Sequence, residues 1–356
     1  MRINLFAPKL IGWYRHQHRD LPWRHTRDPY FIWLSEVILQ QTRVVQGLPY
    51  YLQFTEAYPT VFDLAAAPEQ AVIRLWQGLG YYSRARNLHQ TAQFIVNEMN
   101  GKFPTTYHKL LKLKGIGPYT AAAIASFAYD EAVAVVDGNV YRVLARIFGI
   151  ATDITSTEGK KQFAELANEL LDTAQPATYN QAIMEFGALQ CAPISPDCLL
   201  CPFQADCVAN ATGQISKLPV KIKKTKVRER FFNYFVIIKN QKIALKQRTD
   251  RDIWQQLYDF CLVETPEKAT SLDDLELSQA LQNLLNTGKI TAPARSYSHI
   301  LTHQRIEAQF WQIELTTNDQ STLPENLQWY SPAEAEELPK PVLIASYWAQ
   351  MQMDFP

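Results

Sequence analysis

The hydrophobic pattern divides the chain into a helical part and a mixed part. In the first part, apolar residues recur three or four positions apart, as Trp33 and Val37 do after the pair Asp28-Pro29. An N-cap residue, a proline at the first helical position and apolar residues at this spacing together predict a helix. Similar stretches predict further helices at 60–78, 84–99, 104–112, 118–128, 139–148, 157–173 and 178–188.

The pattern changes after residue 230. Two stretches rich in aromatic and β-branched residues, 231–238 and 243–246, flank the polar turn 239–242. This arrangement is typical of a β-hairpin. We therefore expect a mainly α-helical domain at 1–216, a linker at 217–230 and a mixed α/β domain at 231–356. No run of about 18 apolar residues is present to span a membrane.

Composition adds little, except at the linker. The 356 residues are 47% hydrophobic and 20% charged with zero net charge, which is ordinary for a soluble protein. Residues 217–230, however, carry seven basic side chains and one acidic one. A solvated linker is the default interpretation of such a run, and contact with phosphates is the second. The N-terminus has no export signal, so we expect an intracellular protein.

Four of the five cysteines lie within 17 residues, at Cys191, Cys198, Cys201 and Cys207. Four thiolates on one loop can hold a [4Fe–4S] cluster or a zinc ion, whereas disulfides do not suit an intracellular chain. Zinc ligands usually form two close pairs, and here only Cys198 and Cys201 are close, so the spacing favours the cluster. The fifth, Cys261, stands in an apolar stretch and is expected to be buried.

Two glycines punctuate the helical part at Gly115 and Gly117, just before an alanine-rich stretch. They permit a tight turn, and the free N–H groups of the helix that follows form an anion site that would suit a phosphate. A bare turn between helices would look the same. Asp137 follows Gly117 by 20 residues at the start of another predicted helix, where an N-cap is the plain interpretation.

Two further positions carry potential chemistry. Glu36 lies among apolar neighbours on its predicted helix, and burial there would raise its pKa and let it act as a general acid. An exposed helical glutamate is the common alternative. The turn 78–86 has two adjacent tyrosines followed by two arginines. Such a turn could insert a ring into a base stack while the arginines hold phosphates, and tyrosines that only pack within the protein would give the same pattern.

In this order, the glycine turn, the later aspartate and the CX6CX2CX5C loop resemble the helix-hairpin-helix DNA glycosylases of the endonuclease III superfamily. The resemblance covers about residues 5–215. Within it, Pro22-Trp23-Arg24 and the stretch from Trp33 to Thr42 are similar to the adenine DNA glycosylase branch, the MutY type. That branch carries a [4Fe–4S] cluster on the four cysteines and a second domain resembling Nudix hydrolases.

The resemblance implies excision of adenine from double-stranded DNA where it is mispaired with 8-oxoguanine or guanine. Glu36 matches the acid that protonates N7 of adenine, and Asp137 matches the carboxylate that faces the sugar cation. Tyr119 and Asn139 match supporting residues around the sugar, and Tyr119 is expected to hydrogen-bond near Asp137. The N-cap position of Asp137 is expected to keep it ionised.

Tyr119 also bears on the type of reaction. In bifunctional relatives a lysine at this position attacks the sugar, so tyrosine implies a monofunctional enzyme that leaves an abasic site. The alternatives are a bifunctional oxidised-pyrimidine glycosylase with lyase activity, a non-enzymatic iron–sulfur DNA-binding protein and an electron-transfer protein. The first would need the lysine, the second would leave Glu36 and Asp137 unused, and the third would need no second domain.

The resemblance assigns the remaining contacts. Arg24 lines the adenine pocket, Gln41 and Tyr81 fill the gap or touch the target, and the Gly115–Gly117 turn contacts DNA. Tyr297-Ser298-His299 resembles the loop that recognises 8-oxoguanine, while the glutamate motif of Nudix hydrolysis is missing from 231–356, which implies a reader domain. The stretch 252–260 departs from the glycine-rich sequence that the family often has there. We expect a monomer in a bacterial-type cytoplasm, associated with the nucleoid through DNA.

Overall fold

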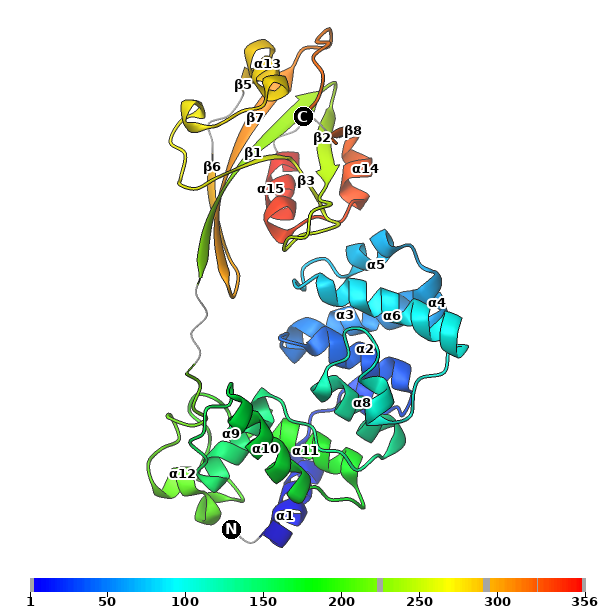
Figure 1. Ribbon diagram of the computed structural model, residues 1–356, viewed down its shortest axis with the longest axis vertical. Coiled ribbons are helices and arrows are strands. Elements are labelled where there is room, and N and C mark those ends of the chain that lie inside the picture. The colour runs from blue at the N-terminus through cyan, green and yellow to red at the C-terminus, as the bar shows by residue number, and fades with distance from the viewer. Residues whose placement is uncertain (1–2, 223–226, 291–294, 325, 354–356) are drawn as a thin grey trace. The chain divides into compact units, whose positions relative to one another are not determined.

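The computed structural model describes residues 3–222, 227–290, 295–324 and 326–353, so positions 223–226 of the predicted linker lie outside the described residues (Figure 1). The chain forms two compact units. The first comprises Met1–Ala66 and Asn87–Lys223, and the second comprises Ala67–Arg86 and Lys224–Pro356. None of the described helices is long and apolar enough to cross a membrane.

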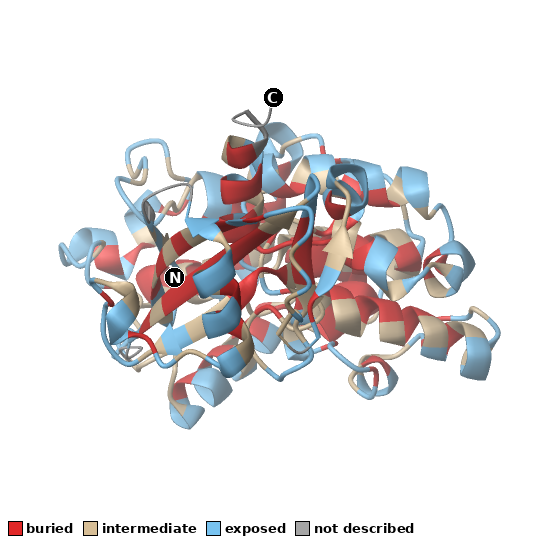
Figure 2. Ribbon diagram, turned by 90° about the horizontal axis from the view of Figure 1, so that it is seen from above, coloured by how far each residue is buried: buried red, intermediate tan, exposed pale blue. Residues whose placement is uncertain are grey.

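Helices make up the first unit, as the hydrophobic spacing predicts. Most bury one side and expose the other (Figure 2). They are α1 (Phe6–Gln17), α2 (Pro29–Leu39), α3 (Val44–Ala57), α4 (Val61–Ala66), most of α6 (Ser83–Met99), α7 (Tyr107–Leu110), α8 (Pro118–Tyr129), α9 (Gly138–Phe148), α10 (Thr157–Glu169), α11 (Pro176–Leu189) and α12 (Val208–Ala211). Short 3-10 turns lie at Ile3–Leu5, Pro22–Arg24 and Gln204–Asp206.

Helix α8 is the centre of this unit. Every residue from Thr120 to Phe127 is buried, and the helix packs against both α2 and α11. A helix that is apolar on all sides belongs in a protein interior, and its alanines let the neighbouring helices approach closely. Residues on α2, α8 and α11 are therefore held in position relative to one another by one packed core.

The predicted helix-hairpin-helix corresponds to α7, a glycine turn and α8. Gly115 has φ of +75°, and a Cβ built on it would stand 2.8 Å from Cβ of Asn87, so a larger residue meets both strain and a clash. Gly117 then caps α8, with Pro118 at its first position. The turn therefore depends on glycine at position 115 above all.

The second unit is built on a mixed sheet with the strand order β3-β2-β1-β7-β5, in which β4 pairs with β1, β6 with β7 and β8 with β2. Its strands are β1 (Arg228–Lys239), β2 (Lys242–Gln247), β3 (Tyr258–Asp259), β4 (Cys261–Thr265), β5 (Lys289–Ile290), β6 (Arg295–Ile300), β7 (Gln304–Leu315) and β8 (Gln328–Tyr330). Its helices are α5 (Glu69–Leu75), α13 (Gln279–Thr287), α14 (Pro332–Glu337) and α15 (Val342–Met353), with a 3-10 turn at Leu272–Asp274.

The predicted hairpin joins β1 to β2. Ile238 pairs with Ile243, and Lys239 pairs with Lys242. The two residues between them, Asn240 and Gln241, both have positive φ, as the twist of a two-residue hairpin requires. The core strand β1 also pairs in parallel with β7 along its whole length.

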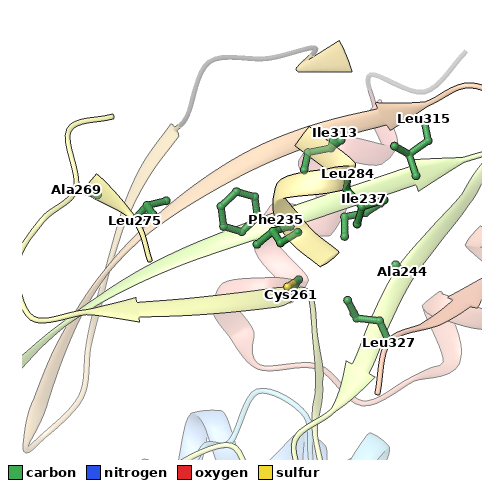
Figure 3. Packing of buried hydrophobic residues seen from close by; sticks show 11 residues of the cluster. Phe235, Ile237, Ala244, Cys261, Ala269, Leu275, Leu284, Ile313, Leu315 and Leu327 are labelled. Carbon is green, nitrogen blue, oxygen red and sulfur yellow. The ribbon is translucent and has the colours of Figure 1, made fainter. Parts of the chain in front are cut away.

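Alternating residues of these strands fill two different layers. Phe235, Ile237 and Ile313 pack with Leu284 of α13 on one face, where Cys261 is buried as predicted (Figure 3). On the other face Phe310 stacks on Tyr347 of α15, with ring centroids 3.9 Å apart. Because successive strand residues point to opposite faces, one sheet supports a helix on each side.

We predict that Gly187→Ala lowers the free energy of unfolding by about 1–3 kcal/mol, because a Cβ on this residue of α11 would stand 2.6 Å from Cβ of Asn139 on α9. Urea denaturation followed by circular dichroism measures the change. The matched control is Gly12→Ala on α1, where nothing lies within 4 Å. It should raise stability by about 0.5–1 kcal/mol, and equal effects of the two substitutions would refute the close packing of α11 on α9.

Candidate active site

A pocket of about 650 Å³ opens in the first unit where α2, α3, α8, α9 and α11 converge. Its lining brings together residues that lie more than a hundred positions apart in the sequence. Six of the residues predicted from the sequence line it: Arg24, Glu36, Gln41, Tyr119, Asp137 and Asn139. This pocket is therefore the candidate active site.

Glu36 is buried on α2, with 5% of its surface exposed. Burial raises its pKa to about 7, and the negative charge of Asp137 adds to the rise. The hydroxyl of Tyr119 donates a 2.6 Å hydrogen bond to Oε2, and this bond and Arg24 act in the opposite direction. The carboxyl group therefore exchanges its proton near neutral pH, as a general acid must.

Asp137 is the N-cap of α9, as the sequence predicts. Its Oδ1 accepts from the backbone N–H groups of Asn139 and Val140, and its Oδ2 accepts from the Asn139 amide at 2.8 Å. These bonds lower its pKa, but burial outweighs them, and the net shift is upward from the ordinary value. The N-cap position thus favours the ionised form of Asp137, while desolvation acts against it.

The hydroxyl of Tyr119 hydrogen-bonds to Glu36, which lines the same pocket as Asp137. The reason is its place near the start of α8, which packs directly on α2. Its hydroxyl also lies 3.8 Å from Sδ of Met184. Burial together with the charges of both carboxylates raises the pKa of Tyr119 well above its ordinary value, so the phenol stays protonated and acts as a donor.

Two arginines of α9 that the sequence analysis missed connect this pocket to the cysteine loop. Arg142 donates to Oδ1 of Asn139 at 2.8 Å and to the carbonyl of Cys191 at 2.8 Å. Arg146 is buried and donates to Sγ of Cys191 at 3.5 Å and to the carbonyls of Cys191, Ala192, Pro193 and Leu218. The sequence signal for Arg146 would have been a charged residue on the otherwise apolar face of a predicted helix.

The four cysteines of the loop line one small cavity of about 20 Å³. Within the described ranges, no three His, Cys, Asp or Glu side chains are gathered as a preformed metal site. Four free thiols around one cavity, with a buried arginine beside Cys191, nevertheless form a donor set that suits an iron–sulfur cluster. No lysine or arginine occurs between Cys191 and Cys207, while Leu199 and Leu200 are exposed.

Glu185 of α11 is a further residue that the sequence analysis missed. Its side chain is 1% exposed and forms ion pairs with Arg19 at 2.6 Å and Arg24 at 2.7 Å. All three residues line the pocket. A lone glutamate within a helix of apolar residues gives a weak signal, because its partners stand more than 160 positions away.

Four of the predicted residues, Tyr81, Tyr297, Ser298 and His299, lie in the second unit. Tyr81 is 41% exposed, has φ of +47°, and bonds to the hydroxyl of Thr302 at 2.5 Å. Tyr297 of β6 packs edge-on against Phe310 and donates to Gln350. His299 lies near Trp254, whereas Ser298, on the opposite face of the strand, is exposed. Ser298 of the tripeptide 297–299 is therefore exposed, whereas Tyr297 is half-buried against Phe310.

Comparison with known proteins gives two family matches. Residues 34–169 match the HhH-GPD superfamily of base excision DNA repair proteins, and residues 233–350 match the NUDIX domain. Among solved structures, a thermostable thymine-DNA glycosylase is 30% identical with a TM-score of 0.55, covering 59% of this chain and 97% of its own. An endonuclease III–DNA complex, 21% identical with a TM-score of 0.52, covers 59% of this chain and 96% of its own and shares the fold.

Sequence relatives are more specific. Adenine DNA glycosylase of Buchnera aphidicola from Schizaphis graminum is 33% identical over 85% of this chain and 86% of its own length. The mouse and human adenine DNA glycosylases are each 44% identical over 61% of this chain, and the match spans 44% and 43% of their lengths. The chain thus matches less than half of the mammalian relatives but most of the bacterial one. On the strength of that nearly full-length relationship, the chain belongs to the adenine DNA glycosylase family of base excision repair.

Proposed function

We propose that this chain is a monofunctional glycosylase that hydrolyses the N-glycosidic bond of adenine mispaired with 8-oxoguanine or guanine in double-stranded DNA. The observation that carries the proposal is the buried Glu36 carboxyl, whose pKa of about 7 lets it hold a proton at neutral pH. It shares its pocket with Asp137, a second carboxylate. Two carboxyl groups with different environments suit the two tasks of glycosidic cleavage.

In this proposal Glu36 delivers its proton to N7 of adenine. The base then leaves as a neutral molecule, which removes the largest barrier to breaking the bond. Adenine inside a duplex cannot reach a buried acid, so the nucleotide has to flip into the pocket at a cost of a few kcal/mol. Arg24 and Gln41 line the pocket and are the side chains proposed to meet the flipped nucleotide.

Asp137 is proposed to stabilise the positive charge that develops on the sugar. Its carboxylate is held by two backbone N–H groups and the amide of Asn139, so it is oriented before the reaction begins. Tyr119 stands where a lyase would need an amine, and its hydroxyl is committed to Glu36. The alternative of a bifunctional lyase is therefore less favoured.

Cys191, Cys198, Cys201 and Cys207 are proposed to hold a [4Fe–4S] cluster, which would cross-link the loop through four metal–thiolate bonds. Arg146 and Arg142 already tie the first of these cysteines to α9. Because the loop itself carries no cation, phosphate contacts are assigned to the Gly115–Gly117 turn and to the basic linker 217–230.

The second domain is proposed to read 8-oxoguanine on the opposite strand. Support comes from the NUDIX match, from the missing hydrolytic motif and from Ser298, which is exposed on β6. His299 is half-buried, and burial lowers its pKa, so it is neutral at pH 7 and able both to donate and to accept a hydrogen bond.

We predict that Glu36→Gln lowers the single-turnover rate of adenine excision about 10²- to 10⁴-fold, because the amide cannot give up a proton to the base. Binding to the same duplex, measured by fluorescence anisotropy, should remain. The matched control is Glu165→Gln on α10, where the side chain is 68% exposed, and it should leave the rate unchanged. Excision at the wild-type rate by Glu36→Gln would remove the assigned acid.

The pH dependence of excision follows from the same group. Because Glu36 works in its protonated form and its pKa is about 7, the rate should fall as pH rises through 7, by about tenfold per unit above pH 8. On the acidic side the rate should fall as Asp137 takes up a proton, at a pH above its ordinary value of 3.8. A rate independent of pH between 6 and 9 would contradict this assignment.

The product distinguishes monofunctional from bifunctional action. A duplex with adenine opposite 8-oxoguanine should be cut on the adenine strand only after alkali treatment, because Tyr119 supplies no amine to the sugar. Denaturing gels with and without alkali measure this. Equal cutting in both lanes would instead support a lyase.

A further inference from the structure

The Glu185 carboxylate is saturated with hydrogen bonds from two arginines. Its Oε1 accepts from the backbone N–H and Nε of Arg19, both at 2.8 Å, and from Nη1 of Arg24 at 3.1 Å. Its Oε2 accepts from Nη2 of Arg19 at 2.6 Å and Nη2 of Arg24 at 2.7 Å. A carboxylate offers about four lone-pair sites, so five bonds leave none for a substrate.

Glu185, Arg19 and Arg24 form a three-residue cluster that holds Arg24 in one position. The guanidinium also donates to the carbonyl of Arg19 at 2.7 Å and lies over the ring of Tyr14, with 12% of the side chain exposed. Hydrogen bonds outweigh the effect of burial on Glu185 and hold its pKa at about 2, so it is charged at every working pH. Glu185 and Arg24 are thus a fixed, bidentate ion pair at the pocket wall.

Arg24 also acts on Glu36. The charged and titratable groups that bear on the Glu36 carboxyl are Tyr119 from α8, Asp137 at the start of α9, and Arg24 from the turn before α2. A guanidinium keeps its charge at any working pH, so an unpaired Arg24 would favour the ionised form of Glu36 and remove the proton that the reaction needs.

We propose that Glu185 is a positioning residue of this pocket: it fixes Arg24 against the wall and offsets its positive charge, so that Glu36 keeps its proton. The residual positive charge of the three-residue cluster then falls on Arg19, whose side chain is 36% exposed and screened by water. This inference rests on the proposed function of Glu36 and adds a residue that controls it.

The test is the pH profile of single-turnover excision by Glu185→Gln. The midpoint of the alkaline limb should move to lower pH by about one unit, the low end of the effect of a nearby opposite charge. The rate at pH 8 should then fall about tenfold relative to the wild type, while rates below pH 6 approach each other. A uniform fall at every pH with an unchanged midpoint would mean a purely structural role and would overturn the proposal.

Arg19→Gln provides the opposite charge change at a more exposed side chain. It leaves the Glu185–Arg24 pair intact and removes the excess positive charge, so the midpoint should stay or move to higher pH. A shift to lower pH would overturn the proposal.

A titration that does not depend on activity separates this inference from the proposed function. Carbon-13 NMR of the Glu36 carboxyl in the DNA-free protein should give a lower midpoint in Glu185→Gln than in the wild type. If the protein excises no adenine, the proposed function fails while this shift still tests the inference. An unchanged midpoint would overturn the role of Glu185 whatever the activity.

Discussion

Packing of α2 against α8 puts a carboxylic acid in an apolar interior, and the chemistry of the site depends on that burial. Glu36 lies between buried neighbours of α2, and its carboxyl group accepts a hydrogen bond from the Tyr119 hydroxyl. A carboxyl group in such a place gains little from ionising, because the protein replaces only part of the lost hydration. The helix-hairpin-helix turn matters here because it sets where α8 begins and so where Tyr119 stands.

The charged groups around the pocket influence whether Glu36 keeps its proton. An unpaired Arg24 would favour the ionised form of Glu36, and Glu185 holds Arg24 in an ion pair. Asp137 raises the proton affinity of Glu36 and is itself held in place by Asn139. From Asn139 the contacts continue through Arg142 to Cys191, so the cysteine loop and the Asp137 carboxylate share one hydrogen-bonded support.

Features that depend on neighbouring residues could be predicted from the sequence. The cap at Asp137, the turn at Gly115, the hairpin at 239–242 and most of the helices agree with the structure, because propensity and capping act over a few positions. The helix predicted at 60–78 is instead two helices, α4 and α5, with Pro68 between them. Burial of Glu36 was left open, because an exposed helical glutamate is the common case, and only the family resemblance implied a role for it.

Features that depend on distant residues could not be predicted in the same way. The partner of Tyr119 lies 83 positions away, and those of Glu185 lie more than 160 positions away, so no local pattern contains them. The upward shift in the pKa of Asp137 is set by tertiary burial, which a cap motif does not reveal. The sequence predicts Tyr297 in a recognition loop, yet it lies in strand β6, where alternation turns its ring against the buried Phe310.

Whether Glu36 holds a proton at neutral pH is measured most directly by carbon-13 NMR titration of side-chain-labelled glutamate in the wild-type protein, with the Glu36 signal assigned by its loss in Glu36→Gln. We expect a midpoint near pH 7, well separated from those of the exposed glutamates, because burial of Glu36 raises its pKa to about 7. A midpoint near the ordinary value of 4.5 would contradict this expectation, since Glu36 would then be ionised at neutral pH and could not serve as the acid.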